Sequence, residues 1–282
     1  MQNIISERTF VLNCKGKGLI LKKPIVMGII NATPDSFFAN SRSLKINEAV
    51  LLAEKMIGDG ATIIDIGGQT TKPGSDAITA AEEMDRVVPV IEAIAEAFPD
   101  TYISVDTYYA TVAEAAVNAG ACIVNDISGG MFDDDMLPTV AKLKVPYILM
   151  HIQGVPKTMQ DNPTYKNITT EIIDYFIERI NKCKQAGIKD VIIDPGFGFG
   201  KTIEHNYQLL QLLHTFQMFD NPLLVGVSRK GMIYKPLNIS ADEALNGTTV
   251  LNTIALQQGT QILRVHDVKE AKQAIDLLGL IP

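Results

Sequence analysis

The sequence predicts a single-domain α/β protein: a (β/α)₈ TIM barrel over residues 23–282, preceded by an N-terminal β-hairpin in residues 1–22. Three observations support this prediction: eight short runs rich in Val and Ile, amphipathic stretches between them, and a glycine after most of those stretches. The length of 282 residues also suits one barrel, since such barrels run to about 250 residues as one unit. An open, doubly wound sheet remains the alternative, because a strand count does not prove that the sheet closes.

The hairpin is the first element expected. Apolar residues fill Thr9–Cys14 and Gly18–Leu21, and the turn-forming Lys15-Gly16-Lys17 lies between them. Two short apolar runs around a glycine turn are typical of a β-hairpin. We expect this hairpin to cover one end of the barrel.

The eight apolar runs are too short for helices and too continuously apolar for strands with one face in water. Such runs are typical of parallel strands that are buried on both faces. We expect strands at Ile25–Ile30, Thr62–Ile66, Tyr102–Val105, Ala121–Val124, Pro146–Met150, Asp190–Ile193, Leu223–Val227 and Gln261–Val265.

Stretches with apolar residues at helical spacing lie between these strands. The clearest are Ile46–Met56, Ala80–Phe98, Val112–Asn118, Ile168–Gln185 and Ala241–Gln257. Glycine readily adopts the left-handed backbone that ends a helix. Such glycines precede the second, fourth, sixth and eighth predicted strands, at Gly58 and Gly60, Gly120, Gly187 and Gly259. No linker, repeat or change in composition marks a second domain.

Composition excludes several classes of protein. The chain has 25 basic and 32 acidic residues, a net charge of −7 and no basic stripe, so we expect no nucleic-acid partner. No apolar run reaches the length of about 18 residues expected of a membrane span, and the first residues do not resemble a signal peptide. The three cysteines, Cys14, Cys122 and Cys183, have no metal-binding spacing, and we expect them to be reduced thiols. We therefore expect a cytoplasmic protein with no membrane partner.

Polar side chains end or follow all eight predicted strands. In a (β/α)₈ barrel the C-terminal ends of the strands meet at one end, which is where the active site lies. The residues are Asn31, Asp65, Asp106, Asn125, Asp126, His151, Asp194, Ser228, Arg229, Lys230, Arg264 and His266. One polar strand end is ordinary, but eight of them predict a binding site.

The mixture of residue types indicates a ligand with two parts. Carboxylates and amides can accept the N–H donors of a flat nitrogen heterocycle, whereas Lys230, Arg264 and His266 suit an anionic group. Phosphate commonly binds near the last strands of such barrels, beside a helix N-terminus. The glycines of Gly196–Gly200 lack the spacing of a dinucleotide-binding turn and fit a loop that clamps a ligand.

Eight segments, in order, resemble the signature blocks of the dihydropteroate synthases, which are pterin-binding enzymes. The first two blocks are the most specific, and the resemblance runs from residue 28 to residue 268. The segments are Gly28–Phe37, Asp65–Gly74, Ser104–Thr107, Asn125–Gly130, Met150–Gly154, Asp194–Lys201, Ser228–Lys230 and Arg264–Val268.

The resemblance implies a transferase of folate biosynthesis that works with Mg²⁺ and forms a homodimer. It would join p-aminobenzoate to (7,8-dihydropterin-6-yl)methyl diphosphate and release pyrophosphate. Two alternatives stay open: a pterin-binding paralogue without catalysis, and a methyltransferase that passes a methyl group from methyltetrahydrofolate to a corrinoid protein.

The resemblance also implies roles for individual residues. Asp106, Asn125, Asp194 and Lys230 would hold the pterin ring, and Asn31 would contact Mg²⁺ with the pyrophosphate. Arg264 and His266 would bind phosphate oxygens. Phe37, Thr71, Pro73 and Phe197 would shape the p-aminobenzoate pocket, and Lys72, Met150 and Gly231 would also bind substrate.

The chain departs from the family pattern in two loops and at one further position. After Phe37 the family usually has Ser-Asp-Gly-Gly, whereas this chain has Phe38-Ala39-Asn40-Ser41. The usual Glu-Ser-Thr-Arg-Pro-Gly is Gln69–Gly74 here, with Lys72 in place of Arg. These changes would remove an ion pair that closes the two loops over p-aminobenzoate. The residue after Lys230, often Ser, is Gly231.

Some of these residues also suit purely structural roles. Asp65 precedes two glycines, so its side chain fits a local turn cap as well as a site. We interpret His151 as part of a pocket wall, Asp133–Asp135 as a solvated helix N-terminus, and Cys122 as a small core residue.

Overall fold

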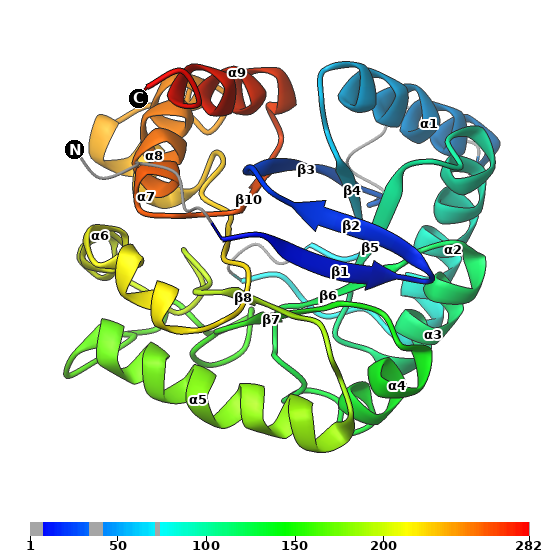
Figure 1. Ribbon diagram of the computed structural model, residues 1–282, viewed down its shortest axis with the longest axis horizontal. Coiled ribbons are helices and arrows are strands. Elements are labelled where there is room, and N and C mark those ends of the chain that lie inside the picture. Colours follow the sequence, from blue (N-terminus) through cyan, green and yellow to red (C-terminus); the bar gives the residue numbers. More distant parts are fainter. Residues whose placement is uncertain (1–7, 34–41, 71–73, 282) are drawn as a thin grey trace.

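The computed structural model describes residues 8–33, 42–70 and 74–281, with only the backbone of residues 42–44. Its main sheet has eight parallel strands in the order β8-β7-β6-β5-β4-β3-β10-β9. A parallel bridge between Ile193 and Leu223 joins the two ends of this order, so the sheet forms a nearly closed ring (Figure 1). This confirms the barrel and excludes the open sheet.

The strands of the ring fall where the apolar runs predicted them. They are β3 (Ile25–Asn31), β4 (Ile63–Gly67), β5 (Tyr102–Asp106), β6 (Ile123–Asp126), β7 (Tyr147–Met150), β8 (Val191–Asp194), β9 (Leu224–Val225) and β10 (Ile262–Val265). The main difference is β9, which has two residues instead of five. It ends at Val225, where its pairing with β10 ends.

Helices surround the ring, as Figure 1 shows. They are α1 (Arg42–Gly58), α2 (Ala80–Ala97), α3 (Ala110–Ala119), α4 (Met136–Leu143), α5 (Ile168–Ala186), α6 (Ile203–Gln211), the 3₁₀ helix η2 (Leu213–Met218), α7 (Gly231–Leu237), α8 (Leu245–Gln257) and α9 (Val268–Leu278). Their ends follow ordinary capping chemistry. Thr79 and Glu82 form a capping box at the start of α2, and glycines with positive φ end α3 and α5, at Gly120 and Gly187.

The hairpin pairs β1 (Phe10–Cys14) with β2 (Lys17–Leu21). Lys15 and Gly16 have φ angles of 52° and 87°, and two successive positive φ values suit a tight hairpin turn. Leu12, Cys14, Leu19 and Leu21 are buried against apolar residues inside the N-terminal end of the ring, among them Met27, Ile63, Cys122, Ile123, Ile148, Ile192, Leu224 and Ile262. The hairpin therefore covers this end, as predicted.

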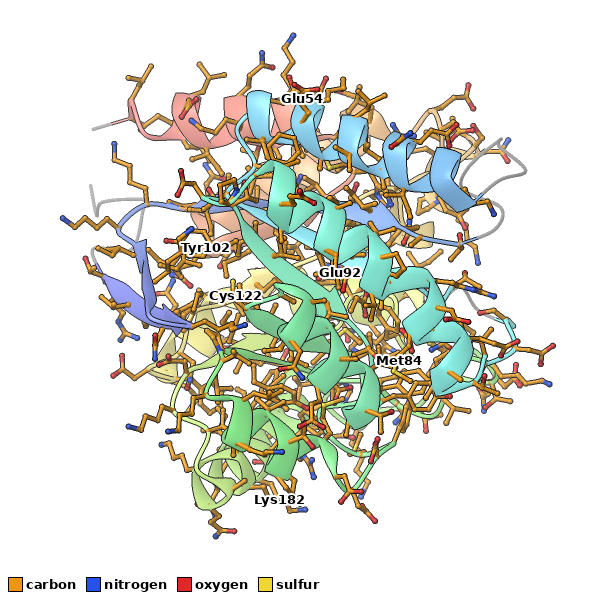
Figure 2. The ribbon with its side chains drawn as sticks, turned by 90° about the vertical axis from the view of Figure 1, so that its right-hand side faces the viewer. Glu54, Met84, Glu92, Tyr102, Cys122 and Lys182 are labelled. Atoms are coloured by element: carbon orange, nitrogen blue, oxygen red, sulfur yellow. The ribbon has the colours of Figure 1, made fainter. Side chains whose placement is uncertain are left out.

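Figure 2 shows the same arrangement from the side. The hairpin lies at one end of the barrel, near Tyr102 and Cys122, and Met84 of α2 lies toward the other end. All three cysteines are buried and unpaired, and the core position predicted for Cys122 is confirmed. In the described ranges no helix is both long and apolar enough to cross a membrane.

Candidate active site

The candidate site lies at the end of the ring opposite the hairpin, where the parallel strands finish in polar residues. Asn31 is the last residue of β3, Asp106 of β5, Asp126 of β6 and Asp194 of β8. His151 directly follows β7. Because neighbouring strands are parallel and in register, these side chains are gathered at one end of the barrel.

A buried ion-pair cluster joins Arg264 to two carboxylates. Nη2 of Arg264 lies 2.6 Å from Oδ2 of Asp65 and 2.6 Å from Oδ2 of Asp106. Nε of Arg264 also donates to Asp65 at 2.6 Å, and Nδ2 of Asn125 donates to the same oxygen at 3.1 Å. Asp65 therefore binds side chains from two other strands rather than the glycine turn that follows it.

Burial raises the pKa of Asp106 to about 7. The guanidinium of Arg264 opposes this rise, and the negative charge of Asp65 adds to it. Burial therefore disfavours the charged form of Asp106, and Arg264 stabilises that form.

Asp194 and Lys230 are two further charged residues of the site, and their charges act on each other. Asp194 is buried, and its Oδ1 accepts a hydrogen bond of 2.8 Å from the backbone N–H of Gly196. Burial raises the pKa of Asp194, and the charge of Lys230 opposes this rise. Burial lowers the pKa of Lys230 to about 8, against the charge of Asp194.

The ammonium of Lys230 is held by the loop that follows β8. Its Nζ donates to the backbone oxygen of Phe197 at 2.6 Å and lies 4.6 Å from the centre of the Phe199 ring. A cation at this distance from an aromatic ring is attracted to it. The loop therefore fixes Lys230 near Asp194.

His266 lies directly after β10 and binds Ser228. Nδ1 of His266 is 3.0 Å from Oγ of Ser228, and the backbone N–H of His266 donates to the same oxygen at 3.2 Å. Burial and the charge of Arg264 lower the pKa of His266 to about 4. When the hydroxyl of Ser228 donates to Nδ1, the imidazole proton lies on Nε2.

Two other polar residues at strand ends, Arg229 and Asp126, form their hydrogen bonds with groups of the protein itself. Arg229 binds Asp267 through two hydrogen bonds, of 3.0 and 2.7 Å. Asp126 accepts from the backbone of Ser128 and Gly130 and from the hydroxyl of Tyr147, each at 2.7 Å. These contacts shape the turns around the site.

The structure describes only some of the remaining residues that were predicted to bind substrate or metal. Asn31 is exposed at the end of β3, Met150 is buried at the end of β7, and Gly231 is the first residue of α7. Phe37, Ala39, Thr71, Lys72 and Pro73 lie outside the described residues, so their predicted roles and the loop ion pair stay predictions.

The ring of Phe197 departs from its predicted place in the p-aminobenzoate pocket. It is fully buried and belongs to the core between the strands and the helices. Phe199, two residues later, is partly exposed and packs near Met150 and Tyr108. Gly196, Gly198 and Gly200 all have positive φ, so the backbone of this loop does not follow the regular path of a strand, and the motif alone did not show which ring faces the core.

Two buried titratable residues near the site, Glu83 and Lys201, were not predicted. Glu83 of α2 accepts from the hydroxyl of Thr107 at 3.1 Å, and Lys201 lies 3.0 Å from His151. A sequence signal existed for Glu83, because it lies one turn before Val87 on the apolar face of a helix. For Lys201 the signal was its place at the end of the segment Asp194–Lys201, which resembles a signature block of the family.

Comparison with known proteins agrees with this geometry. The model of the pterin binding enzyme family matches residues 27–266. Dihydropteroate synthase of Escherichia coli K12 is 47% identical over 266 residues, which cover 94% of each chain.

Two solved structures are similar over nearly the whole chain. Yersinia pestis dihydropteroate synthase, with a sulfonamide drug complex, has a TM-score of 0.90 and 44% identity and covers 96% of this chain and 98% of that one. The enzyme of Xanthomonas albilineans in complex with 7,8-dihydropteroate has a TM-score of 0.87 and 35% identity, over 97% of this chain and 100% of that one. The chain therefore belongs to the pterin-binding enzymes and, among them, to the dihydropteroate synthase family.

Proposed function

We propose that the chain condenses p-aminobenzoate with (7,8-dihydropterin-6-yl)methyl diphosphate to give 7,8-dihydropteroate and pyrophosphate. The observation that carries this proposal is the placement of Asp194 and Lys230 at one end of a barrel that also holds His266 and Asn31. The Xanthomonas albilineans relative bound to 7,8-dihydropteroate supports the same product.

Asp194 is the group best suited to hold the pterin ring. An ionised carboxylate accepts two N–H donors, and the 2-amino group and ring N–H of a pterin present such a pair. Gly196 orients Asp194, and Lys230 favours its charged form. Asp106 and Asn125, which lie on the neighbouring strands β5 and β6, would complete the contacts to the ring.

The reaction needs no nucleophile from the protein. The amine nitrogen of p-aminobenzoate attacks the methylene carbon, and the carbon–oxygen bond to the diphosphate breaks with its electron pair leaving on oxygen. The amine nitrogen then loses one proton, which balances the new carbon–nitrogen bond. Catalysis therefore depends on positioning and on stabilising charge at the leaving oxygen.

His266 and Arg264 would stabilise the leaving pyrophosphate. The Nε2 proton of His266 is a donor for one phosphate oxygen. Arg264 is held by Asp65 and Asp106 through Nε and Nη2, which leaves Nη1 for a phosphate oxygen.

Asn31 would contact Mg²⁺ at this site. Its exposed amide supplies one hard oxygen at the end of β3, which fits a cation that takes most of its other ligands from phosphates and water. When bound, Mg²⁺ would neutralise the charge that develops on the pyrophosphate.

Release of pyrophosphate tests the proposal directly. Purified protein with Mg²⁺ and both substrates should release pyrophosphate and form dihydropteroate, and omission of p-aminobenzoate or addition of EDTA should stop both. If the protein binds the pterin diphosphate and forms neither product, it is a pterin-binding paralogue without catalysis. Transfer of a methyl group from methyltetrahydrofolate would instead support the methyltransferase.

We also infer that the protein is a cytoplasmic homodimer, in line with its family. The three free, buried cysteines suit a reducing compartment. Light scattering coupled to gel filtration should give twice the mass of one chain, and the monomer mass would overturn the dimer.

A further inference from the structure

Lys201 is a buried lysine outside the set of predicted substrate residues. It follows the loop 195–200 that leads out of β8, and only 2% of its surface is exposed. Its Nζ donates to the backbone oxygens of Gly196 at 2.8 Å and Phe199 at 3.0 Å, and it lies 3.0 Å from Nδ1 of His151. An ammonium has three N–H donors, so these contacts use all of them. A fourth, longer contact of 3.5 Å reaches the backbone oxygen of His151.

The contact with His151 fixes the chemistry of the imidazole. When Lys201 is protonated it can only donate, so Nδ1 of His151 accepts and the ring proton lies on Nε2. Burial lowers the pKa of Lys201 well below its ordinary value, and the charge of Asp194 opposes this. His151 is itself buried, and burial and the charge of Lys201 lower its pKa well below the ordinary value. The pair therefore joins a neutral histidine after β7 to a lysine after β8.

The loops after β7 and β8 touch along their backbones. A Cβ atom on Gly196 would lie 1.9 Å from the backbone oxygen of His151, and one on Gly200 would lie 2.3 Å from that of Gln153. Glycine is required at both positions for this approach. Lys201 holds the contact together, because its donors reach both loops.

The same loop also carries the proposed pterin site. The backbone N–H of Gly196 binds Asp194, while the backbone oxygen of Gly196 binds Lys201. The backbone oxygen of Phe197, between the two oxygens that bind Lys201, binds Lys230. A change in the loop at Lys201 would therefore displace the partners of both Asp194 and Lys230.

We propose that Lys201 is a positioning residue for pterin binding, which ties the loop 195–200 to His151 so that Asp194 and Lys230 keep the arrangement that receives the ring. This inference rests on the proposed function of Asp194. The ammonium of Lys201 also favours the ionised form of Asp194. The other cations that act on Asp194 are Lys230, after β9, and Arg264, on β10.

The Lys201→Met variant tests the proposal through the pH dependence of pterin affinity. We expect the affinity for the pterin diphosphate at neutral pH to fall about tenfold or more. Pterin affinity should fall at low pH as Asp194 takes up a proton. In the variant we expect this fall to begin at a pH higher by about half a unit or more, because Asp194 loses one nearby positive charge that favours its ionised form. A purely structural role would lower the affinity equally at all pH values.

Two further variants separate charge from hydrogen bonding. Lys201→Gln keeps donors for the loop but has no charge, so it should show the same shift in pH dependence with a smaller loss of affinity. Lys189→Met, an exposed lysine before β8, should match the parent protein in both respects. If Lys201→Met binds the pterin diphosphate with the same affinity and the same pH dependence as the parent protein, the inference is wrong. If the parent protein itself does not bind the pterin, the proposed function is wrong.

A measurement on the unaltered protein keeps the proposal testable if the variants do not fold. In ¹⁵N-histidine-labelled protein, His151 should carry its proton on Nε2 and should not titrate between about pH 5 and 8. The signal can be assigned by its loss in His151→Gln. A proton on Nδ1, or titration in this range, would overturn the contact on which the inference depends.

Discussion

Nη2 of Arg264 lies 2.6 Å from Oδ2 of Asp106, although 158 residues separate them in the chain. Asp65 shares the same guanidinium. Arg264→Met would leave two carboxylates without the cation that joins them. Removal of one partner from a buried ion pair is strongly destabilising, so we expect the free energy of unfolding to fall by about 3–5 kcal/mol. Urea denaturation measures this change.

The exposed ion pair between Lys142 and Glu114, of 2.9 Å, provides a matched control. Lys142→Met should change the free energy of unfolding by less than about 1 kcal/mol. A similar small change in Arg264→Met would mean that Asp65 and Asp106 do not depend on Arg264.

Asp194→Asn and Lys230→Met should each weaken binding of the pterin diphosphate. A lost hydrogen bond to a charged group costs about 1.5–3 kcal/mol, which is about tenfold to one hundred and fifty-fold in affinity. Calorimetry measures the loss. Asp190→Asn, just before β8 at the opposite end of the strand, is the control and should leave the affinity unchanged. Unchanged affinity in either test variant would place the pterin elsewhere.

Glu83→Gln should change how stability depends on pH. Burial and the charge of Asp106 raise the pKa of Glu83 to about 8, from an ordinary value of 4.5. The folded protein therefore keeps a proton that the unfolded chain releases, and stability falls as the pH rises from 4.5 to about 8. The loss is at most about 1.4 kcal/mol per pH unit, and Gln at this position should remove it.

Denaturation at several pH values measures the effect of Glu83→Gln. Glu92→Gln is the control, since Glu92 is exposed on the same helix (Figure 2). An identical pH dependence in Glu83→Gln and the parent protein would show that Glu83 is ionised in the folded state.

His266 should take up a proton when the pterin diphosphate binds under mildly acidic conditions. Its pKa of about 4 keeps it neutral in the free protein, and the nearby negative charge of a diphosphate would raise that value. Calorimetry in two buffers with different ionisation enthalpies gives the number of protons taken up. His266→Gln should abolish the uptake and His214→Gln, at an exposed histidine, should not. Uptake that persists in His266→Gln would assign the proton to another group.

Gly231→Ser should lower the KM for p-aminobenzoate by about tenfold, or somewhat more at the upper limit. A Cβ atom at Gly231 meets nothing closer than 3.4 Å, so serine fits, and its hydroxyl adds one donor beside the site. One such hydrogen bond to a carboxylate contributes about 1.5 kcal/mol, or less if it replaces water. Steady-state kinetics measure the KM, and the pterin affinity serves as the control. A higher KM would show that Gly231 does not lie beside bound p-aminobenzoate.

The sequence predicted most of the fold because the barrel repeats one simple pattern. Each strand is apolar on both faces, and residues such as Gly120 and Gly187 end helices by local backbone geometry. The shorter helices α4, α6 and α7 have too few turns to show a clear period, so the sequence predicted no bounds for them. Asp133–Asp135 indicated only where α4 begins, and a helix N-terminus was expected after the last strand, where α9 lies. The two residues of β9 depend on pairing with β10, which no local pattern reveals.

The candidate site was predictable in its residues but not in their contacts. Strand ends indicated Asp106, Asp194 and Arg264, because the fold places such residues at one end of the barrel. The bond between Arg264 and Asp65 joins residues 199 positions apart, and Lys201 meets His151 across 50 positions. Such pairings form only when the strands assemble side by side in the sheet, so the spacing of the residues in the sequence does not predict them.

The glycine-rich loop after β8 also limits how the protein can change under selection. Side chains added at Gly196 or Gly200 would meet backbone oxygen at 1.9 or 2.3 Å, and both residues have positive φ. Almost any substitution at these positions would therefore damage the protein itself. An inhibitor that draws its affinity from the backbone of this loop would leave few mutations by which a cell could become resistant and still use the enzyme.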